Sequence, residues 1–402
     1  MKTRETYDLI VLGGGPAGLA AAVYGGRARL KTLVLEKGNP GGRARTTREI
    51  VNYTGILSAG GEELSWNMAE HAEKFGACIR REEVKSAELS GEIKRIETRK
   101  HIYETKAVII ATGTSPRILG IPGERELTGL GVAYCATCDA EFFKDQTVVV
   151  VGSGDQGIEE SMYIAKFARE VKIVVLHQEG VLDCNRQAAE AALSHPKLTF
   201  IWNSVLDGIC GRDEVTGVRI KNIQTGEITE VDCQGVFFFV GMIPNTALFQ
   251  KEVELDEKGW ILTNERMETS CPGVYAAGDV REKYLRQVCT GVADGAVAAT
   301  AAQRYLEELE YCEKNILQRE EPVLVIFWSP ELEGSLEALN RAEEENRKAS
   351  KPCRVAEMDV SRKKYLAAKF GVVLSAREPA AAVVVEQGKV CKKLDLKVAE
   401  EQ

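Results

Sequence analysis

The fold of this chain is decided by the stretch Tyr7-Asp8-Leu9-Ile10-Val11-Leu12-Gly13-Gly14-Gly15-Pro16-Ala17-Gly18. A short apolar run leads into a glycine-rich turn, and an alanine-rich run follows, which predicts strand, turn and helix. Gly13 and Gly15 allow a tight turn and a close approach to a pyrophosphate, and Gly18 lets helix and strand pack closely. The N-terminus of the helix adds a dipole that favours phosphate.

The next predicted strand, residues 31–35, ends in Glu36, which is placed to accept hydrogen bonds from ribose hydroxyls. Farther along, residues 107–110 form another apolar run that ends in Ala111-Thr112-Gly113. These features together predict a complete dinucleotide-binding domain. Two loops, at residues 40–43 and 52–55, connect its elements.

A second fingerprint follows a β-branched strand at residues 147–151. It is Gly152-Ser153-Gly154-Asp155-Gln156-Gly157, and a helix is expected from Ile158. Just before it stands Cys135-Ala136-Thr137-Cys138-Asp139. The dithiol therefore belongs to a second nucleotide-binding domain.

Two cysteines three positions apart fit either a redox dithiol or half of a zinc site. The zinc alternative needs a partner pair, and none of the other nine cysteines is so spaced. At a helix N-terminus the dipole lowers the pKa of one thiol, and only a thiolate attacks a disulfide. Asp139 could exchange a proton with the leaving thiolate. We therefore favour a redox dithiol formed by Cys135 and Cys138.

Composition excludes several classes of function. The chain has 402 residues, 44% of them hydrophobic, and a formal net charge of -8 without a basic run rich in aromatics, which excludes nucleic acid and disfavours anionic membranes. Eleven scattered cysteines indicate a reducing compartment. No apolar run approaches the ~18 residues of a membrane span. We expect a multi-domain cytoplasmic protein.

The chain resembles the low-molecular-weight thioredoxin reductases over residues 5–312. The resemblance rests on the two fingerprints, the Cys-Ala-Thr-Cys between them, and residues 241–246 and 273–280, followed by Arg286 and Gln287. It implies an α/β fold with two Rossmann-like, three-layer ββα domains. One binds FAD (residues 1–116 and 245–317), the other is a pyridine-nucleotide-type domain with the dithiol (117–244), and the family suggests a homodimer.

The resemblance also assigns roles to residues. Cys138 faces the flavin, Cys135 attacks the disulfide of a thioredoxin-like protein substrate, and Asp139 is the acid-base. The nucleotide domain swings between the flavin and the partner. The implied FAD ligands are Gly13, Gly15, Pro16, Ala17, Gly18, Glu36, Gly42, Asn52, Ala111, Thr112, Gly113, Gly278, Asp279, Arg286 and Gln287.

The sequence departs from the family in two places. Members that use NADPH carry His-Arg-Arg after the strand that follows the second fingerprint, whereas this chain has His177-Gln178-Glu179. Glu179 repels a 2′-phosphate and suits a free ribose diol, so NADPH is doubtful, while NADH on Gly152, Gly154, Gly157 and Glu179, or ferredoxin or another protein donor, is favoured. The second departure is Arg43, where the family usually has Gln. Its charge could tune the potential of the flavin, or its side chain could point outward, and we favour the second alternative.

Residues 320–402 form a third unit after a charged linker. Predicted strands at residues 323–328, 354–358 and 381–385 alternate with helices at residues 332–350 and 362–370, an order that resembles thioredoxin. The positions of its two redox cysteines are occupied by Leu332 and Ser335, so this degenerate thioredoxin-like domain cannot exchange disulfides. It serves to dock either a partner protein or the mobile domain of the reductase itself, or else it stabilises the protein or contacts the other subunit of a dimer.

We therefore predict a flavin-dependent disulfide reductase that passes electrons from a donor through FAD and the dithiol to a thioredoxin-like protein. Two alternatives stay open. The acceptor can be another small redox protein, such as one linked to a peroxidase. In a different class, the chain is a flavin-binding redox sensor or interaction module without efficient turnover.

Overall fold

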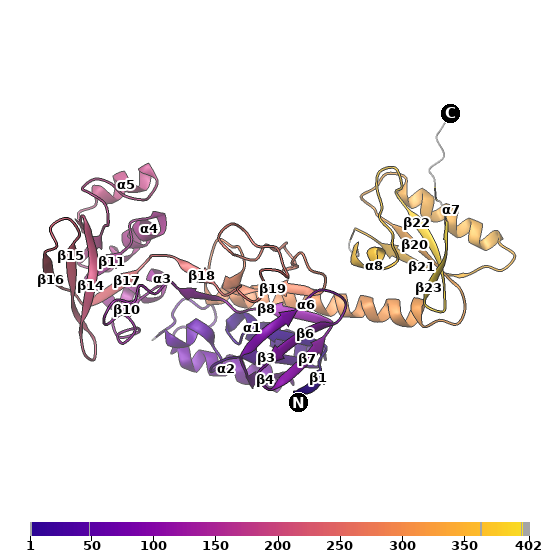
Figure 1. Ribbon diagram of the computed structural model, residues 1–402, viewed down its shortest axis with the longest axis horizontal. Coiled ribbons are helices and arrows are strands. Elements are labelled where there is room, and N and C mark those ends of the chain that lie inside the picture. Colours follow the sequence, from indigo (N-terminus) through magenta and orange to yellow (C-terminus); the bar gives the residue numbers. More distant parts are fainter. Residues whose placement is uncertain (1, 48, 362–363, 395, 397–402) are drawn as a thin grey trace. The chain divides into compact units, whose positions relative to one another are not determined.

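The computed structural model describes residues 2–47, 49–361, 364–394 and 396, and divides into unit 1 (residues 1–300) and unit 2 (residues 301–402) (Figure 1). The helix α6 (Val288–Cys312) belongs to both units, because the boundary falls within it. In the described part of the chain, no helix is both long and apolar enough to cross a membrane.

The first sheet of unit 1 is parallel, with the strand order β19-β8-β2-β3-β4. Strand β2 is buried along its whole length, which explains why its sequence is apolar without alternation. The late strand β19 pairs with β8, so the chain returns to this sheet after an intervening domain. The bounds are β2 (Leu9–Leu12), β3 (Thr32–Glu36), β4 (Cys78–Arg81), β8 (Ala107–Ile110) and β19 (Val274–Ala276), with helices α1 (Pro16–Arg27) and α2 (Gly61–Lys74).

A second sheet, in the order β1-β7-β6-β5, packs against the first. Ile10 and Leu33 of the first sheet share one hydrophobic core with Ile96 and Tyr103 of the second. Helix α1 packs against β2, β3 and β8, so this domain has the three layers expected from the sequence. The bounds are β1 (Thr3–Thr6), β5 (Val84–Glu88), β6 (Lys94–Thr98) and β7 (His101–Thr105).

The second domain of unit 1 repeats this plan around the parallel sheet β10-β17-β11-β12-β13. A separate antiparallel sheet, β14-β15-β16, contributes the other β layer. Strands β9 (Thr114–Pro116) and β18 (Met242–Pro244) pair where the chain leaves and re-enters the first domain. The other bounds are β10 (Val132–Ala133), α3 (Ala136–Asp139), β11 (Thr147–Val151), α4 (Asp155–Ile164), β12 (Glu170–Val174), α5 (Arg186–Leu193), β13 (Leu198–Ile201), β14 (Ser204–Gly211), β15 (Val215–Asn222), β16 (Ile228–Asp232) and β17 (Gly235–Phe238).

Unit 2 contains a mixed sheet in the order β21-β20-β22-β23. The pair β20–β21 is parallel, and β22 and β23 run antiparallel to their neighbours. Helix α7 packs on β20, where Leu339 joins Leu324 and Ile326 in the core. The bounds are β20 (Val323–Trp328), α7 (Ser335–Lys348), β21 (Arg354–Asp359), α8 (Lys364–Lys369), β22 (Ala381–Glu386) and β23 (Lys389–Leu394).

Most elements expected from the sequence are confirmed. The strands predicted at 107–110, 147–151 and 323–328 have those bounds in the structure, and the helix expected from residue 332 begins at Ser335. The first strand is shorter than expected, because β2 begins only at Leu9. The helix expected at 362–370 is α8 (Lys364–Lys369), and residues 362 and 363 lie outside the described residues.

Candidate active site

The first glycine turn is built so that only glycine fits at two of its positions. Gly13 has φ +106°, and a Cβ atom there would lie 2.3 Å from the Ala111 carbonyl oxygen. A Cβ on Gly18 would lie 1.9 Å from the carbonyl oxygen of Gly13. By contrast, a Cβ on Gly15 would meet only Gly42, at 3.9 Å, so this position leaves room above the turn. The turn thus offers a backbone cradle at the N-terminus of α1, as a pyrophosphate requires.

Glu36 lies beside this cradle at the end of β3. Its Oε2 accepts a hydrogen bond of 2.7 Å from the Gly14 backbone N–H, and its Oε1 accepts one of 2.9 Å from Gly38. Two backbone donors therefore hold the carboxylate at the edge of the turn, where a ribose diol could donate to it.

A cleft of about 1450 Å³ extends from this turn. All predicted FAD ligands except Gly18 line it, and so do Cys135, Cys138 and Asp139. The structure thus brings together residues that are up to 274 positions apart in the sequence, from Gly13 to Gln287. Its size and its glycine cradle fit an elongated dinucleotide such as FAD.

Asp279 follows a glycine with φ +79° at the inner wall of the cleft. Burial raises the pKa of its carboxyl group, and the cations Lys283, Arg43 and Arg286 act in the opposite direction. The neighbouring Gly278 N–H donates to buried Asp294, 3.0 Å away, which also pairs with Lys283 at 2.7 Å. Asp294, which the sequence reasoning missed, therefore orients the turn that presents Asp279.

Cys135 and Cys138 form a disulfide. Cys135 is the N-cap of the short helix α3, and Cys138 lies on its single turn, as the spacing predicted. Among the described residues no group of three or more His, Cys, Asp or Glu side chains could hold a metal ion. The disulfide itself, in the wall of the cleft, is the observation that supports redox chemistry.

A chain of hydrogen bonds connects the dithiol with the first domain. Gln287 donates from Nε2 to Thr137 Oγ1 at 2.7 Å, and its Oε1 accepts from Asn52 Nδ2 at 3.2 Å. Thr137 Oγ1 in turn lies 3.5 Å from Cys135 Sγ. Two residues predicted to bind FAD thus also hold the helix of the dithiol.

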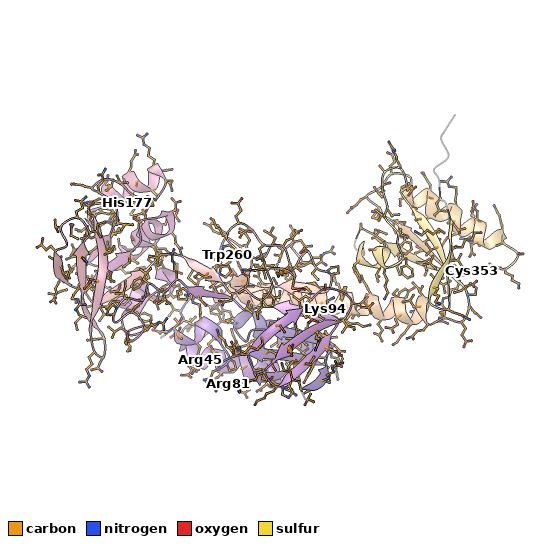
Figure 2. The ribbon with its side chains drawn as sticks, viewed as in Figure 1. Arg45, Arg81, Lys94, His177, Trp260 and Cys353 are labelled. Carbon is orange, nitrogen blue, oxygen red and sulfur yellow. A yellow bond between two sulfur atoms is a disulfide. The ribbon has the colours of Figure 1, made fainter. Side chains whose placement is uncertain are left out.

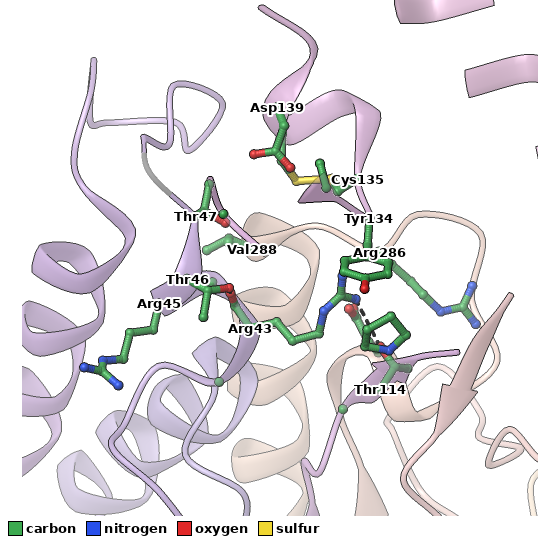
Figure 3. A pocket seen from close by; sticks show the side chains of 18 of the residues that line it. Arg43, Arg45, Thr46, Thr47, Thr114, Tyr134, Cys135, Asp139, Arg286 and Val288 are labelled. Carbon is green, nitrogen blue, oxygen red and sulfur yellow. Dashed lines mark hydrogen bonds between the residues drawn. A yellow bond between two sulfur atoms is a disulfide. The ribbon is translucent and has the colours of Figure 1, made fainter. Parts of the chain in front are cut away.

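Asp139 lies next to the disulfide in the same cleft (Figure 3). Burial raises the pKa of its carboxyl group from 3.8 to about 6, and the positive charge of Arg43 acts in the opposite direction. A carboxyl group that titrates near neutral pH can both give and accept a proton in solution conditions close to physiological.

Arg43 does not point outward as we expected from the sequence. Its Nη1 reaches across the cleft to Thr114 Oγ1 at 3.4 Å and to Met242 Sδ at 3.8 Å (Figure 3). The side chain is accessible from the open side of the cleft, yet the protein around it lowers the pKa of its guanidinium through burial. The expectation failed because the positive φ angles of Gly41 and Gly42 turn the chain into the cleft.

Arg286 lines the cleft, and its guanidinium also stacks on the Trp260 ring, with Cζ 3.9 Å from the centroid. Its Nη2 donates to the Arg281 carbonyl oxygen at 3.3 Å. Cation–π stacking fixes the orientation of this arginine, and its charge acts on the carboxyl group of Asp279.

The second glycine turn has the backbone of the first but different side chains around it. Gly152 has φ +124°, and Cβ atoms on Gly152 and Gly157 would lie 2.6 Å and 2.3 Å from carbonyl oxygens of the protein. The fold itself therefore requires these two glycines. Gly154 has room for a Cβ, since its nearest neighbour would be Asp183, at 3.9 Å.

Glu179 is not at the position that Glu36 occupies in the first domain. In the first sheet Leu12 pairs with Leu35, and Glu36 follows; in the second, Val151 pairs with Val174, so buried Val175 follows. Glu179 lies four residues farther along, in an exposed loop. In strand register, Val175 and not Glu179 therefore corresponds to Glu36, and the binding of a ribose diol by Glu179 stays a prediction.

Acidic side chains surround this second turn. The backbone N–H of Asp183 donates to the Ser153 carbonyl oxygen at 3.0 Å. The carboxylate of Asp183 lies 2.9 Å from Nε2 of His177, and Figure 2 labels His177 in this domain. Asp155, at the first position of α4, accepts from the backbone and side-chain nitrogens of Asn185 at 2.7 and 2.9 Å. These two carboxylates have no counterpart at the corresponding positions of the first turn, where the acidic side chain is Glu36.

Comparison with known proteins gives the class of this fold and site. The family described as "Pyridine nucleotide-disulphide oxidoreductase" matches residues 7–302, and the chain belongs to this family. With its disulfide beside a dinucleotide cleft, it is an FAD-dependent disulfide oxidoreductase.

More particular similarity is to thioredoxin reductases. The thioredoxin reductase of Peptoclostridium acidaminophilum is 47% identical over 310 residues, 75% of this chain and 98% of the relative. That of Bacillus subtilis is 42% identical over 311 residues, 77% and 98%. The crystal structure of thioredoxin reductase from Streptococcus pyogenes superposes with a TM-score of 0.72 at 42% identity, covering 75% of this chain and 99% of that one.

Proposed function

We propose that the chain is a flavin-dependent thioredoxin-disulfide reductase. The observation that carries the proposal is that the Cys135–Cys138 disulfide and Asp139 line the same cleft as the glycine cradle and Asp279. Bound FAD would supply the two electrons that reduce this disulfide, held by the first glycine turn, Glu36 and the wall around Asp279. The similarity to thioredoxin reductases supports a thioredoxin-like acceptor.

The residues of the chain can carry the exchange in balanced steps. The thiolate of reduced Cys135 attacks one sulfur of the substrate disulfide, so that a mixed disulfide forms and the other substrate sulfur leaves as a thiolate. Asp139 in its protonated form gives that thiolate its proton. The ionised Asp139 then takes the proton of Cys138, and the Cys138 thiolate attacks Cys135 Sγ, which restores the Cys135–Cys138 disulfide and expels the second substrate sulfur as a thiolate. Asp139 passes the proton on to that sulfur, so the substrate is released as a dithiol.

For the acceptor, the sharpest experiment is a trapping assay with Cys138→Ser. This variant keeps Cys135 but cannot resolve the mixed disulfide, so a true acceptor stays covalently bound. We expect a thioredoxin-like protein to be trapped, and Cys135→Ser to trap nothing. Trapping of another small redox protein in its place would assign the chain to that acceptor. If no combination of donor and acceptor gives catalytic turnover, the result would favour the alternative of a flavin-binding redox sensor or interaction module.

For the electron donor, we propose NADH or reduced ferredoxin in preference to NADPH. A 2′-phosphate binds to bidentate cations. Gln178 and Glu179 occupy the positions where NADPH-dependent relatives carry two arginines, and the preceding His177 already pairs with Asp183. The carboxylates of Asp155 and Asp183 beside the turn oppose a pyrophosphate as well, which favours a protein donor that delivers electrons to the flavin directly.

The donor is tested by mixing the oxidised holoenzyme anaerobically with each candidate and following the flavin absorbance. We expect rapid bleaching by reduced ferredoxin or NADH, and slow bleaching by NADPH at any concentration below the millimolar range. Rapid bleaching by micromolar NADPH would refute the donor preference without touching the disulfide-reductase activity.

For unit 2, we propose a thioredoxin-like fold without its redox pair. The strand order β21-β20-β22-β23 supports this fold, and Ser335 occupies the place of a buried cysteine. Its hydroxyl donates to the Pro379 carbonyl oxygen at 2.7 Å and accepts from the Ser329 N–H at 2.8 Å. These bonds give Ser335 a structural role, so the unit serves docking or stability and not electron transfer.

Removal of residues 320–402 tests this role. If the unit docks the partner, we expect the KM for the protein acceptor to rise while reduction of a small disulfide is unchanged. If it stabilises the protein or a homodimer, the melting temperature or the oligomeric state changes and KM does not. A truncated protein unchanged in all of these measurements would refute both roles.

A further inference from the structure

The hydroxyl group of Thr137 lies against one sulfur of the disulfide. Its Oγ1 is 3.5 Å from Cys135 Sγ, within hydrogen-bonding distance of a sulfur acceptor. A sulfur in a disulfide carries no hydrogen atom, so the hydroxyl group is the donor and the sulfur is the acceptor. Among the described residues, Thr137 is the only one that makes a hydrogen bond to this sulfur.

The amide group of Gln287 fixes the direction of this hydroxyl group. Nε2 of Gln287 donates to Thr137 Oγ1 at 2.7 Å, so the hydrogen atom of the hydroxyl itself is left free to point toward Cys135. The amide is oriented in turn, because Gln287 Oε1 accepts from Asn52 Nδ2 at 3.2 Å. Hydrogen bonds in a chain polarise one another, so the donation from Gln287 makes the hydroxyl group of Thr137 a stronger donor. A chain of three donors therefore ends at the sulfur of Cys135.

The other groups around Cys135 offer little stabilisation to a thiolate. Helix α3 is a single turn of four residues, so the sum of its peptide dipoles is small. The elements packed against it are α4 and the 3-10 turn Ala140–Phe143, and Arg43 and Arg286 of the first domain line the same cleft. The titratable side chains of the packed elements and of the dithiol stretch are Tyr134, Asp139, Glu141, Asp155, Glu159, Glu160 and Tyr163. In the described part of the chain none of these groups makes a hydrogen bond or an ion pair with Cys135, and ionised carboxylates disfavour a second negative charge.

We propose that Thr137 is a catalytic residue whose hydroxyl group, positioned by Gln287, stabilises the thiolate of Cys135. Reduction of the disulfide takes up two electrons, supplied through FAD, and one proton: the S–S bond breaks, Cys138 becomes a thiol and Cys135 is left as a thiolate. The hydroxyl group then donates to a full negative charge, and such a hydrogen bond is roughly twice as strong as one between neutral groups. Because only the thiolate attacks a disulfide, the bond raises the fraction of reduced enzyme that is ready to react.

This inference deepens the proposed function and rests on it, because it assumes that Cys135 is the thiol that attacks the acceptor. It also changes the explanation of the dithiol spacing. The sequence predicts that a helix dipole activates the thiol, whereas the structure offers a side-chain donor two positions along the chain.

The first test measures the ionisation of Cys135 in the flavin-loaded, full-length Cys138→Ser variant, in which Cys135 has no resolving partner. The rate of alkylation by iodoacetamide is followed against pH, and the modified Cys135 peptide is quantified by mass spectrometry. We expect Thr137→Val, which removes the hydroxyl group and keeps the shape, to raise the midpoint by about half a pH unit or more. Thr137→Ser keeps the hydroxyl group and should keep the midpoint. An unchanged midpoint in Thr137→Val would overturn the inference.

The positioning role of Gln287 is tested in the same assay. Gln287→Met removes the amide donor at similar length, and we expect it to raise the midpoint by less than Thr137→Val does, because the hydroxyl group remains but is no longer oriented. A midpoint equal to that of the parent protein would refute the role of Gln287.

The second test follows the reaction of the reduced enzyme, with both cysteines present, with a small disulfide. Below both midpoints Thr137→Val should react more slowly by about twofold or more, since less thiolate is present. Well above both midpoints it should match or exceed the wild type, because a more basic thiolate is the better nucleophile. A loss that is equal at every pH would indicate a displaced helix and overturn the inference. If the midpoint moves but Cys138→Ser traps no acceptor protein, the proposed function fails and the stabilisation of the thiolate by Thr137 stands.

Discussion

The two glycine turns of unit 1 share one backbone and differ in everything that a ligand would meet. In both, a glycine with positive φ lies against a carbonyl oxygen of the neighbouring strand, and the third glycine packs on the first. In the first turn, backbone N–H groups hold the carboxylate of Glu36 beside the cradle. In the second, Val175 takes that position, and Asp155 and Asp183 bring negative charge to the turn.

The difference shows that a glycine fingerprint has two separate causes. Gly13, Gly18, Gly152 and Gly157 are required because a Cβ would collide with the protein's own backbone, with or without a ligand. Ligand binding is encoded in the residues that follow the next strand, where the ribose and phosphate groups are recognised. The second turn can therefore persist as a structural element of the domain that carries the dithiol.

The largest effect is expected when a methyl group is added to each glycine turn in turn, which tests whether only the first turn binds FAD. Gly18→Ala places Cβ 1.9 Å from the Gly13 carbonyl oxygen, so the cradle must open, and we expect FAD affinity to fall by roughly a hundredfold or more. Gly157→Ala is the matched control, with Cβ 2.3 Å from the Gly152 carbonyl oxygen. It should keep its flavin, measured as the ratio of absorbance at the flavin and protein bands. Equal flavin loss in both variants would contradict separate roles for the two turns.

The carboxylate at the first turn provides the next test. Glu36→Gln removes the charge that Gly14 and Gly38 hold in place, and a charge-assisted hydrogen bond is worth about 2 kcal/mol, so FAD should bind roughly thirtyfold more weakly. Titration of the apoprotein with FAD, followed by flavin fluorescence, measures the change. Asp183→Asn at the second turn serves as the control and should leave the Kd for FAD unaltered.

A third variant rebuilds the missing recognition at the second turn. Gln178 is exposed, so Gln178→Arg disturbs no packing and supplies a cation where relatives that use NADPH carry one. We expect reduction by NADPH to improve about tenfold, because one bidentate contact to a phosphate is gained. Stopped-flow bleaching of the flavin measures the rate, and Gln178→Met is the uncharged control. A gain with NADH as large as that with NADPH would argue against 2′-phosphate recognition.

Sequence reasoning succeeded where local pattern determines structure. The strand–turn–helix units, the helix N-cap at Cys135 and the main strands follow from glycine spacing and apolar periodicity within a few residues. The clustering of Gly13, Glu36, Asn52 and Gln287 in one cleft could be predicted only through the family resemblance.

The features that the sequence could not predict depend on strand register, on backbone angles and on contacts between residues far apart in the sequence. Val175, and not Glu179, corresponds in register to Glu36, because strand pairing, which spacing alone does not define, aligns Val151 with Val174. Arg43 turns inward because of the φ angles of two glycines. Asp294 supports the turn before Asp279 by accepting a hydrogen bond from Gly278, which is 16 residues away along the chain. No sequence motif indicates this contact.

The smallest expected effect concerns the carboxyl groups of the two domains. Burial raises the pKa of Asp139 to about 6 against 3.8 when unfolded, and only Arg43 offsets it, whereas Asp279 has Lys283, Arg43 and Arg286 nearby. A carboxyl group whose pKa is higher in the folded state binds its proton more tightly there. It therefore contributes stability below about pH 4 that is lost as the pH rises through about 6.

Asp139→Asn removes this penalty, since the amide stays neutral at every pH. At pH 8 we expect the variant to be more stable than the wild type by about 1 kcal/mol, less than the full shift implies because the cleft is partly open to solvent. The advantage should shrink steadily between pH 6 and pH 4. Urea unfolding at several pH values measures it, and exposed Asp232→Asn in the same domain is the control. A stability difference that is independent of pH would mean that Asp139 does not titrate near pH 6. The cleft would then not raise the pKa of this carboxyl group enough for it to act as an acid near neutral pH.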